Sequence, residues 1–238
     1  MELLDVLRQR RSIRKYLPQE VEWWKIAEVL DAGRYAPSAG NLQNWNFIVI
    51  EDLEKKKTIA EFSLKQYWMV ESTLLVVCSS METLTQYYGV RGEMLYSIQN
   101  CAACIQNLLL RAQDLRLGSC WVSAFDEDAV KRLLAIPENM RVQAILTLGY
   151  ADEKAEMPPK YALHDLCSFE EFGLKKDDSV WPLAKHQREE QTKKKLRGFS
   201  FKNFLKKKNK SGVEYIKRKR WILSSIIYEA YKENQKQP

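Results

Sequence analysis

Histidine and glycine are scarce in this sequence of 238 residues, and each scarcity excludes a common kind of enzyme site. Only His164 and His186 occur, and neither stands at metal-ligand spacing or beside a Cys/His cluster. We therefore expect neither a metal site nor a Ser-His-Asp hydrolase. The nine glycines form neither G-x-G-x-x-G nor G-x-x-x-x-G-K-[ST]. The sequence thus lacks the dinucleotide fingerprint and the Walker phosphate loop.

Long apolar runs are also missing. The longest candidates, Leu74–Cys78 and Trp221–Tyr228, fall far short of the ~18 residues that a membrane span needs, so we expect none. Acidic residues near the start do not fit a secretory signal, and the five cysteines are an odd number in apolar surroundings. These features predict a cytoplasmic protein with reduced thiols. Cys101 and Cys104 form a C-x-x-C pair within an amphipathic stretch; we expect packing there, with a redox role as the alternative.

The net charge of +7 is unevenly distributed. Residues 1–182 contain 21 basic and 26 acidic side chains, whereas residues 183–238 contain 17 basic and 5 acidic ones. We therefore expect a domain of residues 1–178 and a basic, helical C-terminal extension of residues 183–238 that docks on the rest of the protein or on a partner subunit. The alternatives are contact with an anionic membrane surface and nucleic-acid binding through residues 193–220, where phenylalanines interleave with lysines.

Hydrophobic periodicity predicts helices that alternate with strands, which is typical of an α/β or α+β fold. Apolar, β-branched runs predict strands at Phe47–Ile50, Thr73–Cys78, Cys120–Val122 and Val142–Leu148. The first two have no polar alternation and are expected to be buried on both faces. Helical spacing predicts helices at Leu3–Leu7, Val21–Arg34, Glu93–Arg116, Glu127–Ala135, Phe169–Phe172 and Ile216–Tyr231, and one that starts near Leu53.

Two segments carry residues suited to a phosphate and to a flat ring. Arg10, Arg11, Ser12 and Arg14 can converge on a phosphate dianion through charge-assisted hydrogen bonds, with a solvated basic turn as the alternative. The small residues of the Pro37–Asn41 loop let a flat ring lie against the backbone, and the amides that follow supply donors and acceptors. The alternative for this segment is a simple connecting loop.

Taken together, these segments resemble the FMN-dependent nitroreductase family. "RRSIRKY" (residues 10–16) looks like its R-R-S-x-R-x-[FY] opening, and "APSAGNLQNW" (residues 36–45) is similar to its A-P-S-x-x-N-x-Q-P-W loop. Residues 106–134 resemble its central helix and L-G-x-x-W segment, and "LTLGY" (residues 146–150) its closing strand. The motifs occur in the family's order along the chain.

The resemblance implies an α+β fold, with a central mixed, mainly antiparallel sheet flanked by helices, in a homodimer with FMN at the interface. It implies that the FMN phosphate and ribityl chain are held by Arg10, Arg11, Ser12, Arg14 and Lys160. The flavin ring would meet Gln66, Ser123 and Ala124, together with Pro37, Ser38, Ala39 and Asn41 of the partner subunit.

The implied chemistry belongs to the flavin, so no catalytic side chain is expected. NAD(P)H would deliver hydride to flavin N5 and leave, and an electron-poor small molecule such as a nitroaromatic or a quinone would then accept it, in a ping-pong scheme. Backbone groups at Ser123 or Ala124 would hydrogen-bond N5. The alternative is a relative with other flavin chemistry, such as reductive dehalogenation or flavin breakdown.

Besides Ser72-Thr73 and Arg116, three residues depart from the family's pattern. Asn44 replaces the proline before the loop tryptophan, and Asn100 replaces an aspartate of the central helix. Lys160 stands where the family usually has an arginine, so this contact loses the guanidinium fork and keeps only a point charge.

Overall fold

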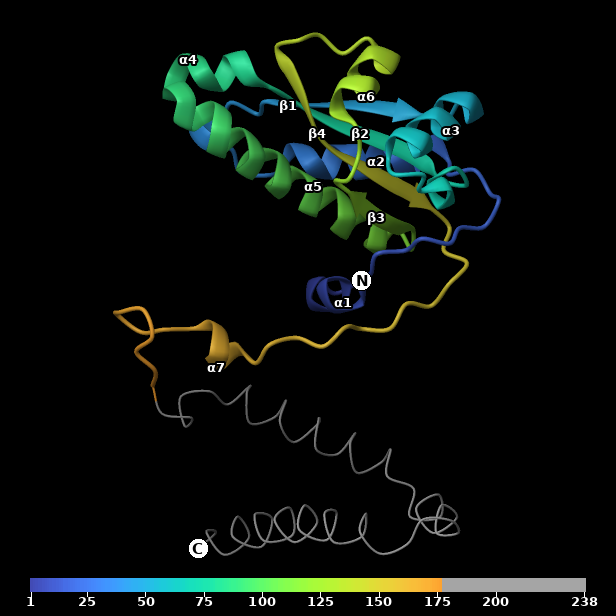
Figure 1. The fold of residues 1–238 in the computed structure, drawn as a ribbon. Coiled ribbons are helices and arrows are strands. Elements are labelled where there is room, and N and C mark those ends of the chain that lie inside the picture. Colours follow the sequence, from blue (N-terminus) through green and yellow to red (C-terminus); the bar gives the residue numbers. More distant parts are fainter. Residues whose placement is uncertain (177–238) are drawn as a thin grey trace, which may run out of the picture. The chain divides into compact units, whose positions relative to one another are not determined.

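The computed structural model describes residues 1–176, which form two compact units, Met1–Pro158 and a second that starts at Pro159 (Figure 1). The strands of the first unit are β1 (Trp45–Ile50), β2 (Thr73–Ser80), β3 (Gly118–Val122) and β4 (Met140–Gly149). Its helices are α1 (Leu3–Gln9), α2 (Trp23–Arg34), α3 (Leu53–Phe62), α4 (Met81–Arg91), α5 (Ser97–Asp114) and α6 (Glu127–Leu134), with short turns η1 (Ala39–Asn41), η2 (Tyr67–Met69) and the π-helical η3 (Gly92–Tyr96). The second unit contains α7 (Leu163–Leu166).

The strands form one antiparallel sheet in the order β1-β2-β4-β3. Each predicted strand is confirmed, with additional residues at its ends. β2 lies at the centre, and all its residues except the last are buried. β1 lies at an edge of the described sheet, and Phe47, Ile48 and Val49 are only half-buried, so the expectation that Phe47–Ile50 is buried on both faces is wrong. The physical reason is that, among the described strands, β1 is flanked by β2 alone.

Helices cover both faces of the sheet (Figure 1). On the face of α2 and α5, Ile26, Ile105 and Leu146 belong to one buried cluster. On the face of α3 and α6, Ile59 and Val130 belong to a second cluster. Because successive strand residues point to opposite faces, the continuous apolar runs of β2 and β4 supply both clusters. The predicted α+β fold with a mainly antiparallel sheet flanked by helices is confirmed.

Capping residues explain where the helices of the second face begin. The side chain of Asp52 accepts a 2.9 Å hydrogen bond from the Lys55 amide at the start of α3, and Asp126 accepts one of 3.0 Å from Ala129 in α6. Each bond satisfies an amide that a first helical turn leaves unpaired.

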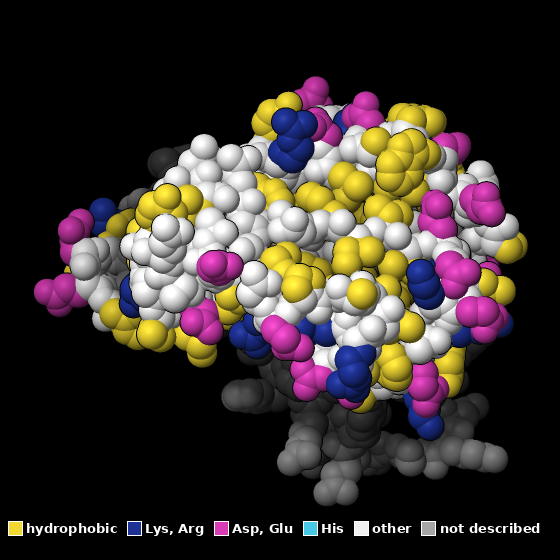
Figure 2. Space-filling model, turned by 90° about the horizontal axis from the view of Figure 1, so that it is seen from above, with side chains coloured by type: hydrophobic (Ala, Val, Ile, Leu, Met, Phe, Trp, Pro, Cys, Tyr) yellow, Lys and Arg dark blue, Asp and Glu magenta, His cyan; other side chains and the backbone are white. Residues whose placement is uncertain are grey.

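Figure 2 shows the molecule from above, with hydrophobic side chains across the middle of the visible surface and charged ones toward its rim.

Two helical predictions differ from the structure, and the helix α4 was not predicted. The helix expected over Glu93–Arg116 starts later, as α5, because the π-helical turn η3 precedes it. Periodicity did not reveal α4, because Leu84 is its one buried residue and the helix has no continuous apolar face. Phe169–Phe172 form bends and turns, so that predicted helix is wrong; the short helix α7 lies just before them. The predicted helix Ile216–Tyr231 lies outside the described residues.

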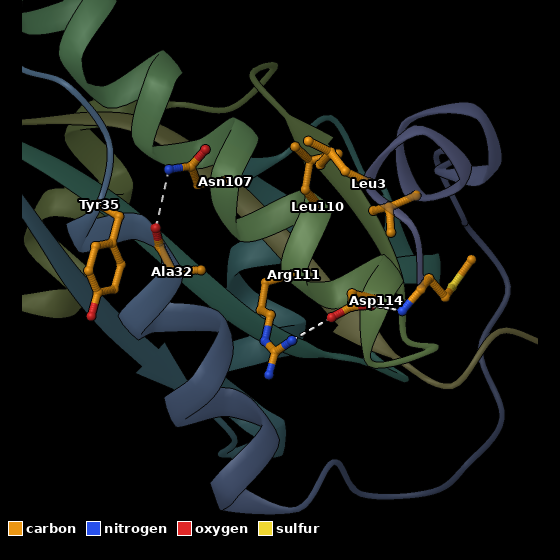
Figure 3. Close-up of a pocket in the computed structure, with 9 residues that line it drawn as sticks. Leu3, Ala32, Tyr35, Asn107, Leu110, Arg111 and Asp114 are labelled. Carbon is orange, nitrogen blue, oxygen red and sulfur yellow. Dashed lines mark hydrogen bonds and ion pairs between the residues drawn. The ribbon is translucent and has the colours of Figure 1, made fainter.

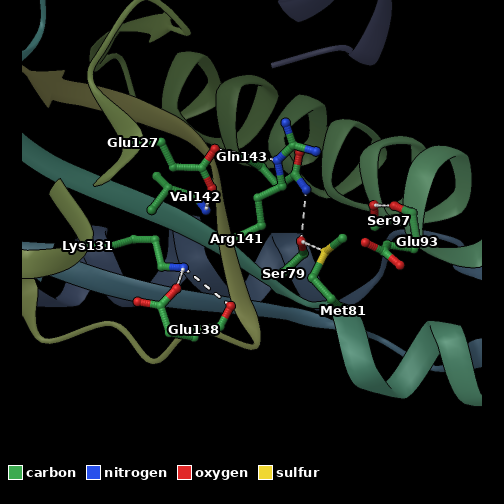
Figure 4. A network of polar contacts seen from close by, with 10 residues as sticks. All are labelled: Ser79, Met81, Glu93, Ser97, Glu127, Lys131, Glu138, Arg141, Val142 and Gln143. Atoms are coloured by element: carbon green, nitrogen blue, oxygen red, sulfur yellow. Dashed lines mark hydrogen bonds and ion pairs between the residues drawn. The ribbon is translucent and has the colours of Figure 1, made fainter. Parts of the chain in front are cut away.

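A polar network ties α6 to the start of β4 (Figure 4). Glu127 accepts the Val142 amide over 3.0 Å and pairs with Arg141 at 3.5 Å. Gln143, next along β4, donates a 2.8 Å bond to the Ser79 hydroxyl at the end of β2. These contacts hold the beginning of β4 against both its neighbouring helix and its neighbouring strand.

Membrane-spanning helices, metal-binding clusters and disulfides are absent from the described residues. No helix within residues 1–176 is long and apolar enough to cross a membrane. In the same residues, no cluster of three or more His, Cys, Asp or Glu side chains could hold a metal ion. The five cysteines are free thiols. Burial raises the pKa of Cys101 and of Cys104 to about 12. Both side chains belong to the buried cluster on the face of α2 and α5, as expected for packing.

Candidate functional site

The predicted phosphate-binding segment lies along the outer edge of β3. Ser12 forms a parallel bridge with Ser119, and the Ile13 amide donates to the Ser119 carbonyl over 3.0 Å. Side chains of an extended segment alternate in direction, so Ile13 is buried while Ser12 and Arg14 are exposed. Gly118 permits this close approach, because a Cβ there would lie only 3.0 Å from the Ile13 side chain.

The arginines of this segment, Arg10, Arg11 and Arg14, form no ion pair with an acidic side chain of residues 1–176. The arginines that do form ion pairs there lie elsewhere in the fold. Arg11 donates from Nη1 to the Arg10 carbonyl over 2.6 Å, whereas its Nε is buried and has no hydrogen-bond partner in the described chain. A buried, unpaired donor on a charged group costs free energy. A bound anion would satisfy it.

The thiol of Cys120 on β3 lies in a positively charged neighbourhood. Burial raises the pKa of Cys120, and so does the charge of Glu153, while Arg14, Ser12 and Arg10 act in the opposite direction. Positive charge and a hydroxyl group, which a phosphate requires, therefore occur on the same side of β3 as this thiol.

Arg14 connects this segment to the chain just before β2. Its guanidinium carbon lies 5.9 Å from the centre of the Trp68 ring, which is a cation–π distance. Glu153 accepts the backbone amides of Arg14 and Lys15, at 2.5 and 3.2 Å. The acid thus fixes the backbone of the segment and leaves the Arg14 guanidinium without an ion pair.

Three further predicted residues lie together where β3 ends. Gln66 donates from Nε2 to the Ser63 carbonyl over 2.8 Å and to the Ala124 carbonyl over 3.5 Å. The Ser123 hydroxyl accepts a 2.8 Å hydrogen bond from the Trp121 indole. Amide, hydroxyl and backbone groups are therefore gathered just beyond the end of β3, the strand that the arginine segment borders.

The loop predicted to meet a flat ring is anchored to α5. The Ala39 amide donates to Asn100 Oδ1 over 3.0 Å, and Asn100 also donates to Asn44 Oδ1 over 2.7 Å. Within the loop, the Ser38 hydroxyl accepts from the Gln43 amide over 3.0 Å. One buried amide side chain thus fixes the loop and the residue that leads into β1.

The tip of the same loop contacts α4. Gly40 has φ 57°, in the left-handed region, and a Cβ there would lie 2.6 Å from the Tyr88 hydroxyl oxygen. Both features favour glycine. Asn41 is also left-handed, with φ 56°, and it is exposed, as is Pro37 at the other end of the loop. The exposed atoms of the loop are therefore presented outward on a fixed backbone.

One chain presents the two halves of the predicted site at opposite edges of its sheet. The arginine segment borders β3, whereas the Pro37–Asn41 loop leads into β1, and β4 and β2 lie between them. Three inter-strand spacings amount to about 14 Å. The strand register separates the two halves further. Trp45, at the start of β1, pairs near the end of β2, which in turn pairs with the start of β4. Gly118, at the start of β3, pairs with Gly149 at the other end of β4.

Lys160 belongs to the second unit, where it lies in an exposed segment that precedes α7. Its contact with a phosphate stays a prediction.

A separate groove of about 320 Å³ lies among α1, α2 and α5 (Figure 3). Asn107 donates to the Ala32 carbonyl over 3.2 Å on its wall, and Arg111 forms an ion pair with Asp114. None of the residues predicted to bind a cofactor lines this groove. The candidate site is therefore the surface beside β3, which Figure 3 does not include.

The comparisons with known proteins agree with the motifs. A sequence profile described as the nitroreductase family matches residues 7–87 and 64–150. The chain belongs to the nitroreductase family.

A protein of Archaeoglobus fulgidus whose name includes NADH dehydrogenase and NAD(P)H nitroreductase is 36% identical over 159 residues, 64% of this chain and 88% of that protein. An iodotyrosine deiodinase of Thermotoga neapolitana is 24% identical over 179 residues, 69% of this chain and 95% of that protein. The solved FMN-dependent nitroreductase of Clostridium difficile R20291 is 26% identical, with a TM-score of 0.62 over 71% of this chain and 99% of that one.

Sequence reasoning missed three residues of the site in this nitroreductase-family chain. Trp68 and Tyr88 reach it only through tertiary contacts, so no local pattern marks them. Asn100 had a usable signal, because it is a polar residue on the buried side of the amphipathic helix α5. Buried amides are normally hydrogen-bonded, so a loop partner could have been anticipated.

Proposed function

We propose that this chain is an FMN-dependent oxidoreductase that passes hydride from NAD(P)H to an electron-poor small molecule. One observation carries the proposal: the segment beside β3 contains Arg10, Arg11 and Arg14, which form no ion pair within residues 1–176, and the buried Nε of Arg11 has no hydrogen-bond partner there. The residues fit a phosphate-bearing flavin, since Arg10, Arg11, Ser12 and Arg14 would hold its phosphate and ribityl chain. Family membership and the name of the Clostridium difficile relative support the same cofactor.

The flavin ring would lie where β3 ends. Gln66 would contact its polar edge, and the backbone at Ser123 and Ala124 would face N5, where dipoles stabilise developing charge. Lys160 would add a point charge near the phosphate. FMN, when bound, supplies the redox step by taking hydride at N5 and returning it to the acceptor.

The position of the Pro37–Asn41 loop supports a homodimer with the site at the interface. Because this loop lies at the other sheet edge of its own chain, the ring would be covered by the partner's copy of the loop. NAD(P)H and the acceptor would use the remaining open side of the ring in turn, as a ping-pong scheme requires. The chain's residues would bind and orient the reactants and exclude water, without acting as nucleophile or general acid.

Spectroscopy tests this proposal directly. Purified protein, or protein supplied with FMN, is expected to show flavin absorbance that NADH or NADPH bleaches anaerobically and that a nitroaromatic or quinone restores. Arg14→Gln is expected to weaken FMN binding, whereas Arg132→Gln, at an exposed arginine on α6, is not. A protein that neither contains FMN nor gains thermal stability from it would refute the proposal.

Reductive dehalogenation is a second candidate, favoured by the relative named iodotyrosine deiodinase. In that reaction two electrons and a proton replace a carbon–halogen bond by carbon–hydrogen and release halide. Iodide release from 3-iodotyrosine, in the absence of nitroaromatic turnover, would support it. Steady NAD(P)H oxidation with a nitroaromatic and no iodide release would exclude it.

The extension of residues 183–238 lies outside the described residues, so its role stays a proposal. We favour docking on the dimer, and nucleic-acid binding through residues 193–220 remains the alternative. Salt-dependent retention on a polyanion that is lost when residues 183–238 are deleted would favour the alternative. A cytoplasmic location likewise stays a proposal, which rests on the reduced cysteines.

A further inference from the structure

The segment that follows β2 folds back on itself beside the Pro37–Asn41 loop. Gly89 occupies a backbone region that is open essentially to glycine alone, with φ 55° and ψ −148°. Gly92 lies so close to the chain that a Cβ there would overlap the Leu84 carbonyl oxygen. These two glycines let the turn η3 pack against α4. As a result, the last residue of α4, Arg91, lies over the last residue of η3, Tyr96.

Contacts between side chains connect Arg91 to the loop. Its guanidinium carbon lies 5.6 Å from the centre of the Tyr96 ring, and its Nε donates to the Tyr96 hydroxyl over 3.1 Å. The Tyr96 ring meets the Tyr88 ring edge to face, with centroids 5.2 Å apart and an interplanar angle of 83°. The Tyr88 hydroxyl in turn lies against Gly40. A cation and two aromatic rings are therefore held as one cluster at the tip of the loop.

This cluster is open to solvent and chemically incomplete. Arg91 is exposed and forms no ion pair within residues 1–176, and no hydrogen bond of its two terminal nitrogens occurs there. Tyr88 is 39% exposed, although it is a large aromatic side chain. The orientation of Arg91 is set by Tyr96, so its planar end is prearranged to receive a carboxylate through two parallel hydrogen bonds. Exposed tyrosine faces favour a flat ring next to it.

We propose that Arg91, held on Tyr96, makes this enzyme select aromatic electron acceptors that carry a carboxylate group. The inference rests on the proposed function, because the proposed function places the Pro37–Asn41 loop of one subunit against the flavin ring bound by the other. An acceptor stacked on the flavin would extend its carboxylate past the loop tip to Arg91, which acts as a specificity-determining residue. Arg91 takes no part in hydride transfer itself, and the acceptor's nitro or quinone group remains the site of reduction.

The test compares 4-nitrobenzoate with its uncharged analogue 4-nitrobenzamide, using the full-length, FMN-loaded protein. Arg91→Gln is expected to lower kcat/KM for 4-nitrobenzoate about tenfold or more, mainly by raising KM, and to change kcat/KM for 4-nitrobenzamide less than about twofold. Arg91→Lys keeps the charge without the fork and is expected to lie between the two. Arg132→Gln is the matched control, since Arg132 is also exposed and without an ion pair in the described residues.

A binding measurement accompanies the kinetics. Benzoate, which cannot be reduced, is expected to perturb the flavin absorbance of the wild type more strongly than benzamide, and Arg91→Gln is expected to abolish the difference. Equal losses for both acceptors would show a merely structural role and overturn the inference. A rise confined to the KM for NADPH would assign Arg91 to the nucleotide's phosphate and overturn it too. Failure of the wild type to bind FMN, or to reduce either acceptor, would refute the proposed function instead.

Discussion

The side-chain amide of Asn100 on α5 donates a 2.7 Å hydrogen bond to Asn44 Oδ1, and its oxygen accepts the Ala39 amide at 3.0 Å. Both asparagines are buried, with 5% and 3% of their surface exposed. Asn44 and Asn100 are also two of the positions that depart from the family's sequence pattern. The two departures are thus in contact, and together they hold the loop against the central helix.

Replacing Asn100 is expected to loosen that loop. Asn100→Leu leaves the Ala39 amide and Asn44 Oδ1 without their partner, which lowers the free energy of unfolding by about 1–3 kcal/mol. FMN affinity is expected to fall as well, because the loop contributes to the partner's site. Urea unfolding and fluorescence titration with FMN measure the two effects. Asn107→Leu, on the same helix, is the control and is expected to leave FMN affinity unchanged; equal affinities for Asn100→Leu and the wild type would contradict the prediction.

Replacing Arg11 is expected to weaken FMN binding with little effect on the stability of the apoprotein. Arg11→Met deletes the buried Nε, which has no partner in the described residues, and also the Nη1 hydrogen bond to the Arg10 carbonyl. Because the two effects oppose each other, the free energy of unfolding of the apoprotein is expected to change by less than about 1 kcal/mol. The lost charge-assisted hydrogen bonds are expected to weaken FMN binding about tenfold or more. Thermal unfolding of the apoprotein and FMN titration measure both quantities. An unchanged FMN affinity would place the phosphate elsewhere.

Gly40→Ala is expected to destabilise the protein by about 1–3 kcal/mol, since alanine is strained at φ 57° and its Cβ would overlap the Tyr88 hydroxyl. Denaturant unfolding measures the change. Tyr88→Phe removes the hydroxyl while leaving the backbone strain, so the same glycine substitution is expected to cost less in that background. If Gly40→Ala lowers the free energy of unfolding equally in the wild type and in Tyr88→Phe, the overlap with the Tyr88 hydroxyl does not contribute to the destabilisation.

Thiol labelling is expected to separate Cys167 from the other cysteines. Burial raises the pKa of Cys78 to about 11 and that of Cys101 and Cys104 to about 12, so these thiols carry little thiolate at pH 8. Cys167 is the half-buried cysteine. Iodoacetamide on the native protein is therefore expected to modify Cys167 first, as read by peptide mass spectrometry. Rapid labelling of Cys101 or Cys104, or a disulfide between them, would restore the redox alternative.

Acid is expected to remove a stabilising contact of Glu22. Its carboxylate accepts a 2.6 Å hydrogen bond from the Tyr150 hydroxyl and pairs with Lys25 at 3.0 Å, and these contacts lower the pKa of Glu22 to about 2 from the usual 4.5. A lowered pKa in the folded state gives stability that is present above the unfolded value and is lost as the pH falls toward 2. The difference in unfolding midpoint between the wild type and Glu22→Gln is therefore expected to shrink from pH 6 to pH 3. A constant difference would contradict it.

The sequence predicted most of the core. The apolar, β-branched runs at Thr73–Cys78 and Val142–Leu148 indicated central strands because a strand buried on both faces has no polar alternation. The same reasoning failed for Phe47–Ile50, since the run does not reveal that its strand lies at an edge of the sheet. It also failed at α4, because a helix whose one buried residue is Leu84 has no apolar repeat that periodicity could detect.

By itself, the sequence determined the kinds of side chain that meet a ligand: a cluster of arginines with a serine, a small-residue loop, and the order of motifs that marks the family. Only the tertiary structure decided that the arginine segment and the loop lie at opposite edges of one sheet, that Arg14 lies over Trp68, and that Tyr88 meets Gly40. The physical reason is that local sequence sets backbone preference and side-chain chemistry, whereas these contacts depend on strand order and helix packing between residues far apart in the chain.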